Sequence, residues 1–335
     1  MFKFFRKIRL GLISKNRLGK YFIYAIGEII LVVIGILIAL NLNNQNEQRK
    51  SEAKIELVFE GIMEELIADI EKTEMPLRYF AIRDSLVRLV LIENVSKEDY
   101  KNDQKGLNTL LNWTNRVELT NYAFDALMQD INSIPDKFKP VIPDLRILYN
   151  RYKIQVEKAN SKFENVVLNY QEFVKNNFSW YLVRNEQDWD QKIEYMLNNF
   201  RYRNTVQEYG NAGMNQQMKL SIDYRKQAIR CYQKIAKILN KPEYHSSFTF
   251  DEELAEKLVG EWQTVGSPND ITVHFIKDKR LYGKDKNNPN DQWEIFYVPQ
   301  FNKIVDDDRD YATIIQKNDE IVLKFHRGFD IKKIN

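Results

Sequence analysis

The stretch YFIYAIGEIILVVIGILIALNL, Tyr21 to Leu42, decides the architecture of this chain. Glu28 is its only charged residue, and the stretch reaches the roughly 20 apolar residues that a helix needs to cross a bilayer. Inside lipid a backbone must satisfy its own hydrogen bonds, so such a segment is helical. Tyr21 and Tyr24 suit the headgroup level at one end, and the polar run 41–46 marks the other. The sequence therefore predicts a transmembrane helix over residues 21–42.

The flanks of this segment predict its orientation. Residues 1–20 hold seven basic residues and no acid, whereas the twenty residues after Leu42 hold three basic residues and four acids. The excess of positive charge places the N-terminus in the cytoplasm and the rest of the chain outside it. An uncleaved anchor is favoured over a cleaved signal peptide, because the apolar core is long and the residues after Ala39 lack a small-x-small cleavage pattern.

Glu28, Gly35 and Ala39 fall on roughly one face of the predicted helix. A carboxylate costs about 3 kcal/mol at the bilayer centre and less near the interface. Gly35-x-x-x-Ala39 is a small-xxx-small pattern, which lets two helices approach closely. Two interpretations stand. Either Glu28 lies near the cytoplasmic end, where it snorkels or is protonated, or the three residues form an interaction site for a second copy or another membrane protein.

The first fifty residues combine a basic start with YAIGEIILVVIGILIALNLNN, residues 24–44. This opening resembles that of a bacterial family, domain-of-unknown-function family 6090, whose helix has the form YAIGEIxLVxIGILIALxxNN. The likeness is close over residues 1–50 and loose beyond them. It implies a single-pass protein of the bacterial inner membrane with a mostly helical remainder, and it makes Gly27, Glu28 and Gly35 family features. The family has no assigned activity, so the resemblance implies no chemistry.

Charge is distributed unevenly along the chain. Residues 1–42 hold seven basic residues and one acid, but the formal net charge of the whole chain is only +3. The remainder is therefore slightly acidic, which argues against nucleic acid as a partner. The basic start, interleaved with Phe2, Phe4, Phe5 and Ile8, predicts a surface helix attracted to anionic lipid headgroups.

The region after the anchor predicts a stalk that continues into a helical bundle. Apolar residues recur at helical spacing from Ile55 to Ile70, and the helix is expected to end at Met75-Pro76. A second helix is expected over residues 77–92. Thr120 is expected to cap a short helix through its hydroxyl.

The longest soluble helix is predicted after Pro143. Its apolar positions alternate spacings of four and three over four heptads, with neither Gly nor Pro inside. These positions are Leu145, Tyr149, Tyr152, Val156, Ala159, Phe163, Val166, Tyr170 and Phe173. The seam is aromatic and irregular in size, which favours packing inside a bundle of the same chain over a parallel dimer.

Two further helices are predicted, near 188–208 and near 214–239, with a turn at residues 210–213 between them. The first has Phe200 among its inward residues, and the second has Cys231 on its apolar stripe. Cys231 is the only cysteine of the chain, so no intramolecular disulfide forms and a buried thiol is expected.

After a linker at 242–256 the hydrophobic period changes from helical to alternating. Alternating segments around Ile271, Trp293, Tyr311 and Ile321 predict an antiparallel sheet. Gly260-Glu-Trp262 resembles the Gly-x-Trp opening of lipocalin-like domains. Residues 257–335 look too short for an eight-stranded barrel that holds a ligand, so a small open barrel or curved sheet is expected.

The sequence offers no catalytic constellation. His245, His274 and His326 share no metal-ligand spacing, and the latter two are expected at solvent-facing strand positions. A nucleophile elbow and a phosphate loop are absent from the sequence. The acidic run 306–310 lacks the spacing of an EF-hand, so a solvated turn is favoured over a calcium loop.

An aromatic group, Trp180, Tyr181 and Trp189, flanks an expected interhelix loop. Such a group fits either packing in a core or binding of a partner or sugar, and the sequence does not separate the two.

These patterns predict an α+β protein with an N-terminal transmembrane helix, a mainly helical bundle with a long heptad-patterned helix, and a small antiparallel β domain. The expected parts are a basic segment 1–20, the membrane helix 21–42, the bundle and stalk 43–241, a linker 242–256 and the β domain 257–335. The expected function is a non-enzymatic envelope scaffold, sensor-like or partner-binding protein without cofactor or metal. The alternative is small-ligand or lipid binding by the β domain.

Overall fold

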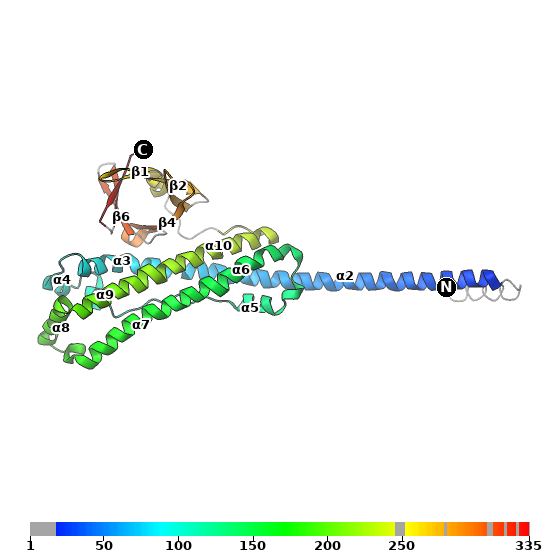
Figure 1. Ribbon diagram of the computed structural model, residues 1–335, viewed down its shortest axis with the longest axis horizontal. Coiled ribbons are helices and arrows are strands. Elements are labelled where there is room, and N and C mark those ends of the chain that lie inside the picture. The colour runs from blue at the N-terminus through cyan, green and yellow to red at the C-terminus, as the bar shows by residue number, and fades with distance from the viewer. Residues whose placement is uncertain are drawn as a thin grey trace.

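The computed structural model describes residues 18–244, 252–277, 280–306, 311–317, 320–325 and 328–334. A long apolar helix leads into a helical bundle, and an eight-stranded antiparallel barrel follows it (Figure 1). The predicted α+β class, with helices first and a β domain last, is confirmed.

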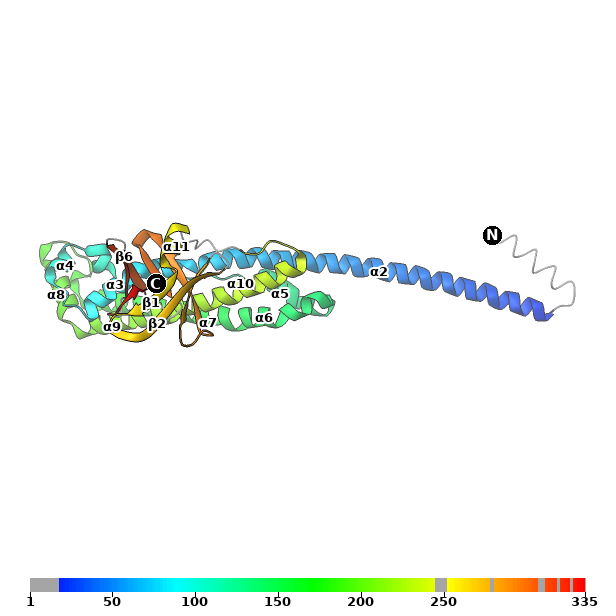
Figure 2. The same ribbon diagram turned by 90° about the horizontal axis from the view of Figure 1, so that it is seen from above.

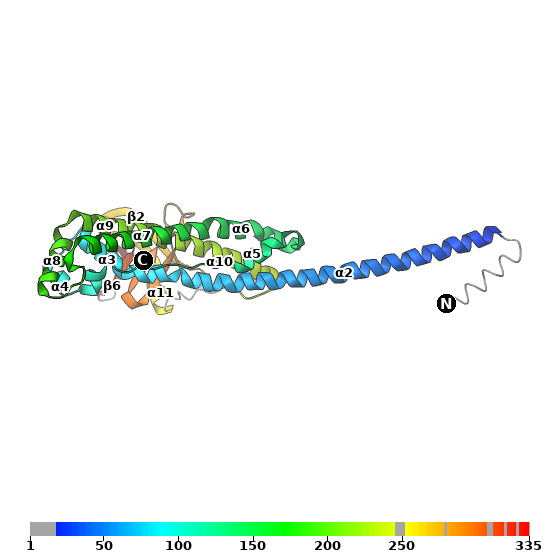
Figure 3. The same ribbon diagram turned by 90° about the horizontal axis from the view of Figure 1, so that it is seen from below.

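Helix α2, Leu18–Lys72, runs unbroken through 55 residues, about 80 Å at 1.5 Å per residue. Its first half extends away from the rest of the molecule, and its second half lies in the bundle (Figure 3). The predicted continuation of the apolar helix into a stalk is confirmed. The helix ends at Lys72, before the expected stop at Met75-Pro76. Pro76 lies instead in the first turn of α3, Glu74–Leu91, where proline is tolerated.

Two long helical runs complete the bundle, and each contains one π-helical turn. The first consists of α6 (Ile142–Ile147), η4 (Leu148–Lys153) and α7 (Ile154–Asn177), and the second of α9 (Phe200–Ala212), η6 (Gly213–Met218) and α10 (Lys219–Leu239). Shorter pieces connect them, namely α4 (Lys97–Lys101), η1 (Gln104–Thr109), α5 (Tyr122–Gln129), η2 (Ile131–Ser133), η3 (Asp136–Val141), η5 (Ser179–Tyr181) and α8 (Glu186–Asn198).

The heptad seam of the first run packs within the chain, as predicted. Tyr149 stacks on Phe124 with ring centroids 4.4 Å apart. Phe163 meets Phe80 at 5.4 Å and Tyr209 at 4.9 Å. The seam is therefore covered by α3, α5 and α9 and not by a second copy of the same helix.

The predicted turn at residues 210–213 is wrong, since α9 continues through η6 into α10. Gly213 serves close packing there. A Cβ added to it would lie 2.4 Å from Phe80 and 2.9 Å from Phe163. Glycine in this position lets three helices meet, and the chain does not reverse.

The predicted helix over 188–208 is interrupted at Asn199. Its backbone is extended, and its side chain accepts a hydrogen bond from the Arg201 N–H at 2.9 Å, which starts α9. Phe200, expected to point inward, is 76% exposed because the break turns it outward.

Thr120 does not cap α5. The free N–H of Ala123 in the first turn of α5 donates instead to Glu65 Oε1 of α2 at 3.0 Å. Thr120 turns its hydroxyl and its backbone N–H toward Asp69. The Glu65 carboxylate of α2 therefore caps α5, where the sequence predicted the Thr120 hydroxyl.

The barrel is closed, so the expectation of an open barrel or curved sheet is wrong. Its strands follow one another in sequence order, and β8 pairs with β1. They are β1 (Gly260–Thr264), β2 (Ser267–Lys277), β3 (Arg280–Asp285), β4 (Gln292–Val298), β5 (Lys303–Asp306), β6 (Tyr311–Lys317), β7 (Glu320–Phe325) and β8 (Asp330–Lys333), with η7 (Pro299–Phe301) between β4 and β5. Most strands are so short that eight fit into the available length.

Inward side chains fill the barrel. Trp262, Leu281, Ile295 and Leu323 are buried in one apolar cluster inside it. Helix α11, Glu252–Leu258, adds Ala255 and Leu258 to the same cluster. This helix begins within the predicted linker.

The outer face of β4 to β6 rests on the bundle (Figures 1 and 2). Phe296, Val298 and Val305 belong to the apolar cluster of the bundle and not to that of the barrel. Tyr311 donates its hydroxyl to the Leu77 carbonyl of α3 at 2.8 Å. Lys303 donates to the Ala81 carbonyl at 2.6 Å. The two domains therefore share an apolar core.

Candidate functional site

The free half of α2 carries the residues that the sequence singled out. Gly35 and Ala39 are exposed, Glu28 is half-buried, and open space surrounds the position that a Cβ would take on Gly35. Of the described helices, one is long and apolar enough to cross a membrane, and none of its most apolar stretch is buried. Leu31 and Leu37 are 67% and 59% exposed. So much contiguous apolar surface is unfavourable in water and marks a lipid or protein contact.

About 20 Å of helix separates Leu42 from Ile55, the first fully buried residue of the bundle core on α2. This spacer belongs to the same unbroken helix as its two ends. The unbroken helix therefore fixes the orientation of the bundle relative to that of the apolar segment.

A buried carboxylate, Asp69, joins the end of α2 to the bundle. It is fully buried and accepts hydrogen bonds from the Thr120 N–H, the Thr120 hydroxyl and the Tyr224 hydroxyl, each at 2.9 Å. Lys72 lies 3.0 Å away as its counter-ion. Sequence reasoning missed this residue. The signal was an acid beside Leu66 and Ile70 on an apolar stripe.

Arg225 holds the junction of α2, α3 and the barrel. It is fully buried, and its Nη1 donates to the Ile70 carbonyl at 3.2 Å, where a cation suits the C-terminal end of a helix. Glu74, at the start of α3, lies 3.7 Å from the same nitrogen. The guanidinium also lies over the ring of Phe296 from the barrel, 5.7 Å from its centroid.

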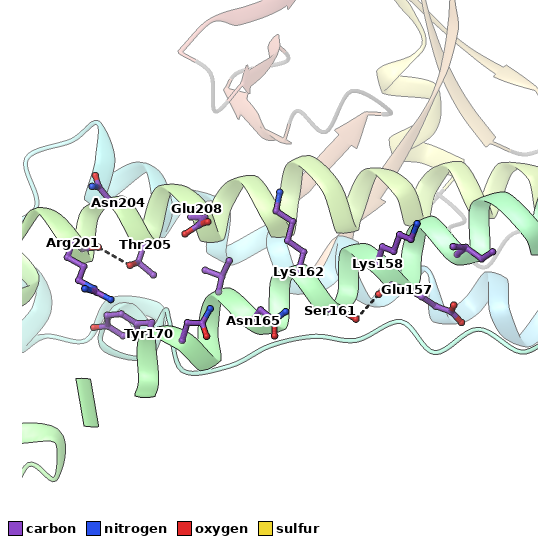
Figure 4. Close-up of a pocket in the computed structure, with 13 residues that line it drawn as sticks. Glu157, Lys158, Ser161, Lys162, Asn165, Tyr170, Arg201, Asn204, Thr205 and Glu208 are labelled. Carbon is purple, nitrogen blue, oxygen red and sulfur yellow. Dashed lines mark hydrogen bonds between the residues drawn. The ribbon is translucent and has the colours of Figure 1, made fainter. Parts of the chain in front are cut away.

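A groove of about 890 Å³ runs between α7 and α9. Lys158, Lys162 and Asn165 project from α7, opposite Arg201 and Glu208 of α9 (Figure 4). Two of its hydroxyl groups are engaged within their own helices, since Thr205 donates to the Arg201 carbonyl and Ser161 to the Glu157 carbonyl.

The chemistry of this groove suits binding. Amides, lysines and carboxylates alternate along it, and Arg201 stacks over Phe173 with its guanidinium 3.5 Å from the ring centroid. Tyr170 lies at one end, and burial raises the pKa of its hydroxyl, so it stays protonated. An extended polar partner would meet hydrogen-bonding groups along the whole groove.

The predicted aromatic group divides between packing and exposure. Trp180 is buried and stacks on Phe178 at 4.7 Å, while Tyr195 lies 5.3 Å away. Tyr181 is 46% exposed. Trp189 is half-buried beneath the Lys192 ammonium, 5.1 Å from its ring centroid.

His274 is buried, so the prediction that it faces solvent is wrong. Its ring lies 5.2 Å from that of Trp262 inside the barrel and hydrogen-bonds the Leu258 carbonyl. Burial lowers its pKa to about 3, because the charged form loses its hydration. The side chain of His274 lies on the face of β2 that points into the barrel, and it is therefore buried. His245 and His326 lie outside the described residues.

Cys231 is buried, as predicted, and burial raises the pKa of its thiol to about 12. A protonated, inaccessible thiol is a poor nucleophile. Within the described ranges, no three His, Cys, Asp or Glu side chains are grouped to hold a metal ion. Of the acidic run 306–310, only Asp306 is described, at the end of β5.

Comparison with known proteins finds no match among family models, curated proteins or solved structures. The resemblance of residues 1–50 to family 6090 stays a prediction.

Proposed function

We propose that this protein is a single-pass, membrane-anchored scaffold that presents a rigid binding body on the extracytoplasmic side of a bacterial inner membrane. Its partners are proteins or polymers of the envelope, and its anchor associates with a second copy or another membrane helix through Glu28, Gly35 and Ala39. Anionic lipid headgroups hold the basic segment 1–20 on the cytoplasmic side.

The continuity of α2 carries the proposal. One unbroken helix contains both the exposed apolar segment and a buried element of the bundle. A catalytic domain on a flexible tether does not need this rigidity, whereas a scaffold that sets a fixed distance and orientation does. The polar groove between α7 and α9 supplies a surface for the partner.

The alternative function, binding of a lipid or small ligand by the barrel, has its support in the lipocalin-like fold alone. Trp262, Leu281 and Ile295 occupy the interior that a ligand would need. A scaffold is therefore the better proposal.

A labelling experiment tests the topology. Single cysteines replace Ser267 or Asn288, which are both exposed, in a chain that carries Cys231→Ser. A membrane-impermeant thiol reagent added after opening only the outer envelope should label both positions. A cysteine in place of Lys3 is the control, which we expect to react only after lysis. Labelling of the barrel positions only after lysis would reverse the topology and reject an extracytoplasmic scaffold.

A cross-linking experiment tests the anchor. Leu42→Cys extends the heptad spacing of Glu28 and Gly35, whereas Leu40→Cys points to nearly the opposite side of the helix. In a Cys231→Ser background, oxidation of membranes should yield a covalent dimer for Leu42→Cys and little for Leu40→Cys. Adding Gly35→Leu or Glu28→Leu should reduce the dimer at least about tenfold. Equal dimer yields in all of these variants would reject self-association through this face.

A further inference from the structure

A second groove, of about 340 Å³, lies where α10 meets β2, β3 and β4 of the barrel. Lys226 and Arg230 contribute from α10, and Lys277 and Arg280 from the barrel. Glu294 is the one acid among the residues that line the groove. Four positively charged side chains from the two domains therefore line one groove, although the chain after residue 42 has a slight net negative charge.

Arg280 shows that this groove is more than a solvated surface. It is only 8% exposed, and its Nε has no hydrogen-bond partner among the described residues. Glu294 Oε2 is 3.7 Å from its Nη1, which is too far for a hydrogen bond. The Nε is itself buried, so a ligand does not reach it from the groove. An oxyanion in the groove would lie beside a buried guanidinium whose charge the Glu294 carboxylate meets at a distance too long for a hydrogen bond.

The shape of the donors selects the ligand class. A guanidinium presents a planar fork that matches two oxygens of a phosphate or similar oxyanion, and flanking ammonium groups neutralise further charge. We propose that the groove between α10 and the barrel binds a compact oxyanion of two or more negative charges, a phosphate group above all, clamped between the two domains.

The position of the groove identifies a soluble source of the phosphate. Tyr224, which lies two residues before Lys226 and six before Arg230, donates its hydroxyl to Asp69, which lies 27 residues beyond Leu42 on α2. Because α10 runs antiparallel to α2, the groove lies roughly 30–40 Å beyond the apolar segment. The headgroup layer of a bilayer is only about 5–8 Å deep, so a lipid in the membrane does not reach it.

Calorimetric titration of the full chain, in nanodiscs of zwitterionic lipid, tests this inference with inorganic phosphate and pyrophosphate as probes. Pyrophosphate should bind, and it should bind more tightly than phosphate. Arg230→Gln and Lys277→Gln change exposed side chains at the rim, so folding is not at risk, and each should weaken pyrophosphate about tenfold. Lys237→Gln, an exposed cation elsewhere on α10, is the matched control and should leave binding unchanged.

Arg280→Gln should abolish binding, and Arg280→Lys should not restore it, because an ammonium lacks the planar fork. The absence of any heat with wild-type protein, or equal affinity in the two rim variants and the control, would overturn the inference. Repeating the titration in nanodiscs with anionic lipid should give the same affinity. Loss of pyrophosphate binding there would overturn the soluble source, since the lipid would then be the competitor.

Discussion

The burial of several polar residues is the feature that the sequence patterns did not predict. Asp69, Arg225 and His274 all occupy positions that periodicity alone assigns to apolar or surface residues. Each is buried because partners from distant parts of the chain, such as Thr120 and Tyr224 for Asp69, complete its hydrogen bonds. One sequence cannot show these partners, since they lie 51 and 155 residues away from Asp69.

His274 makes the stability of the barrel depend on pH. Its pKa is about 3 in the folded chain and about 6.5 when exposed, so the unfolded state binds the proton more readily. The contribution of His274 to the free energy of unfolding is therefore fully present only above about pH 6.5, and it is lost as the pH falls toward 3. Between pH 6.5 and 4.5 the expected loss through this residue is about 2 kcal/mol.

Urea unfolding followed by tryptophan fluorescence checks this pH dependence. The difference in unfolding free energy between pH 6.5 and 4.5 should be smaller in His274→Leu and in His274→Gln than in the wild type. Carboxylates contribute equally to all three proteins and cancel in the comparison. Identical differences would mean that the imidazole is already charged, or solvated, in the folded barrel.

At the scale of elements, the sequence predicted the helices with long regular stripes and misjudged their breaks. The stalk and the heptad helix follow from apolar spacing, and both are confirmed. The break at Asn199 comes from a local N-cap that the apolar spacing did not reveal, whereas the continuity at Gly213 depends on tertiary contacts that oppose local preference. The closed barrel was missed because chain length was compared with that of barrels built from longer strands.

Two glycines on helices test this account in opposite directions. Gly213→Ala should destabilise the protein by about 1–3 kcal/mol, because the new methyl group collides with Phe80 and Phe163. Gly61→Ala in α2 meets only Ala123 at 3.6 Å and should stabilise by up to about 1 kcal/mol through helix propensity. Thermal unfolding of both variants gives the comparison. A stabilising Gly213→Ala would mean that the rings leave room at this crossing.

At the scale of the whole molecule, contacts between the barrel and α3 join the two domains. The candidate sites differ in whether the sequence could predict them. The apolar anchor with Glu28, Gly35 and Ala39 could be read from sequence, whereas both grooves arise from elements far apart in the chain. Neither groove has a contiguous motif, so no pattern in the sequence marked it.

Val305→Glu tests the union of the two domains. Val305 is fully buried on the outer face of β5, and a charge there lacks a partner in the apolar cluster of the bundle. We expect one cooperative melting transition in the wild type and two in the variant. Val265→Glu, at an exposed turn of the barrel, should behave as wild type. A single transition in Val305→Glu would show that the domains stay docked without this contact.

The pairing of β8 with β1 has a consequence for the order in which the protein is made. Strand β1 leaves the ribosome first among the strands and waits with an unpaired edge until β8 emerges about 70 residues later. During that interval the growing sheet is open to wrong partners. The bundle precedes the strands in the sequence, and in the folded protein it carries the apolar surface on which β4 to β6 pack. The helical half of the molecule is thus placed in the sequence where it can act as an internal chaperone for the strands that follow.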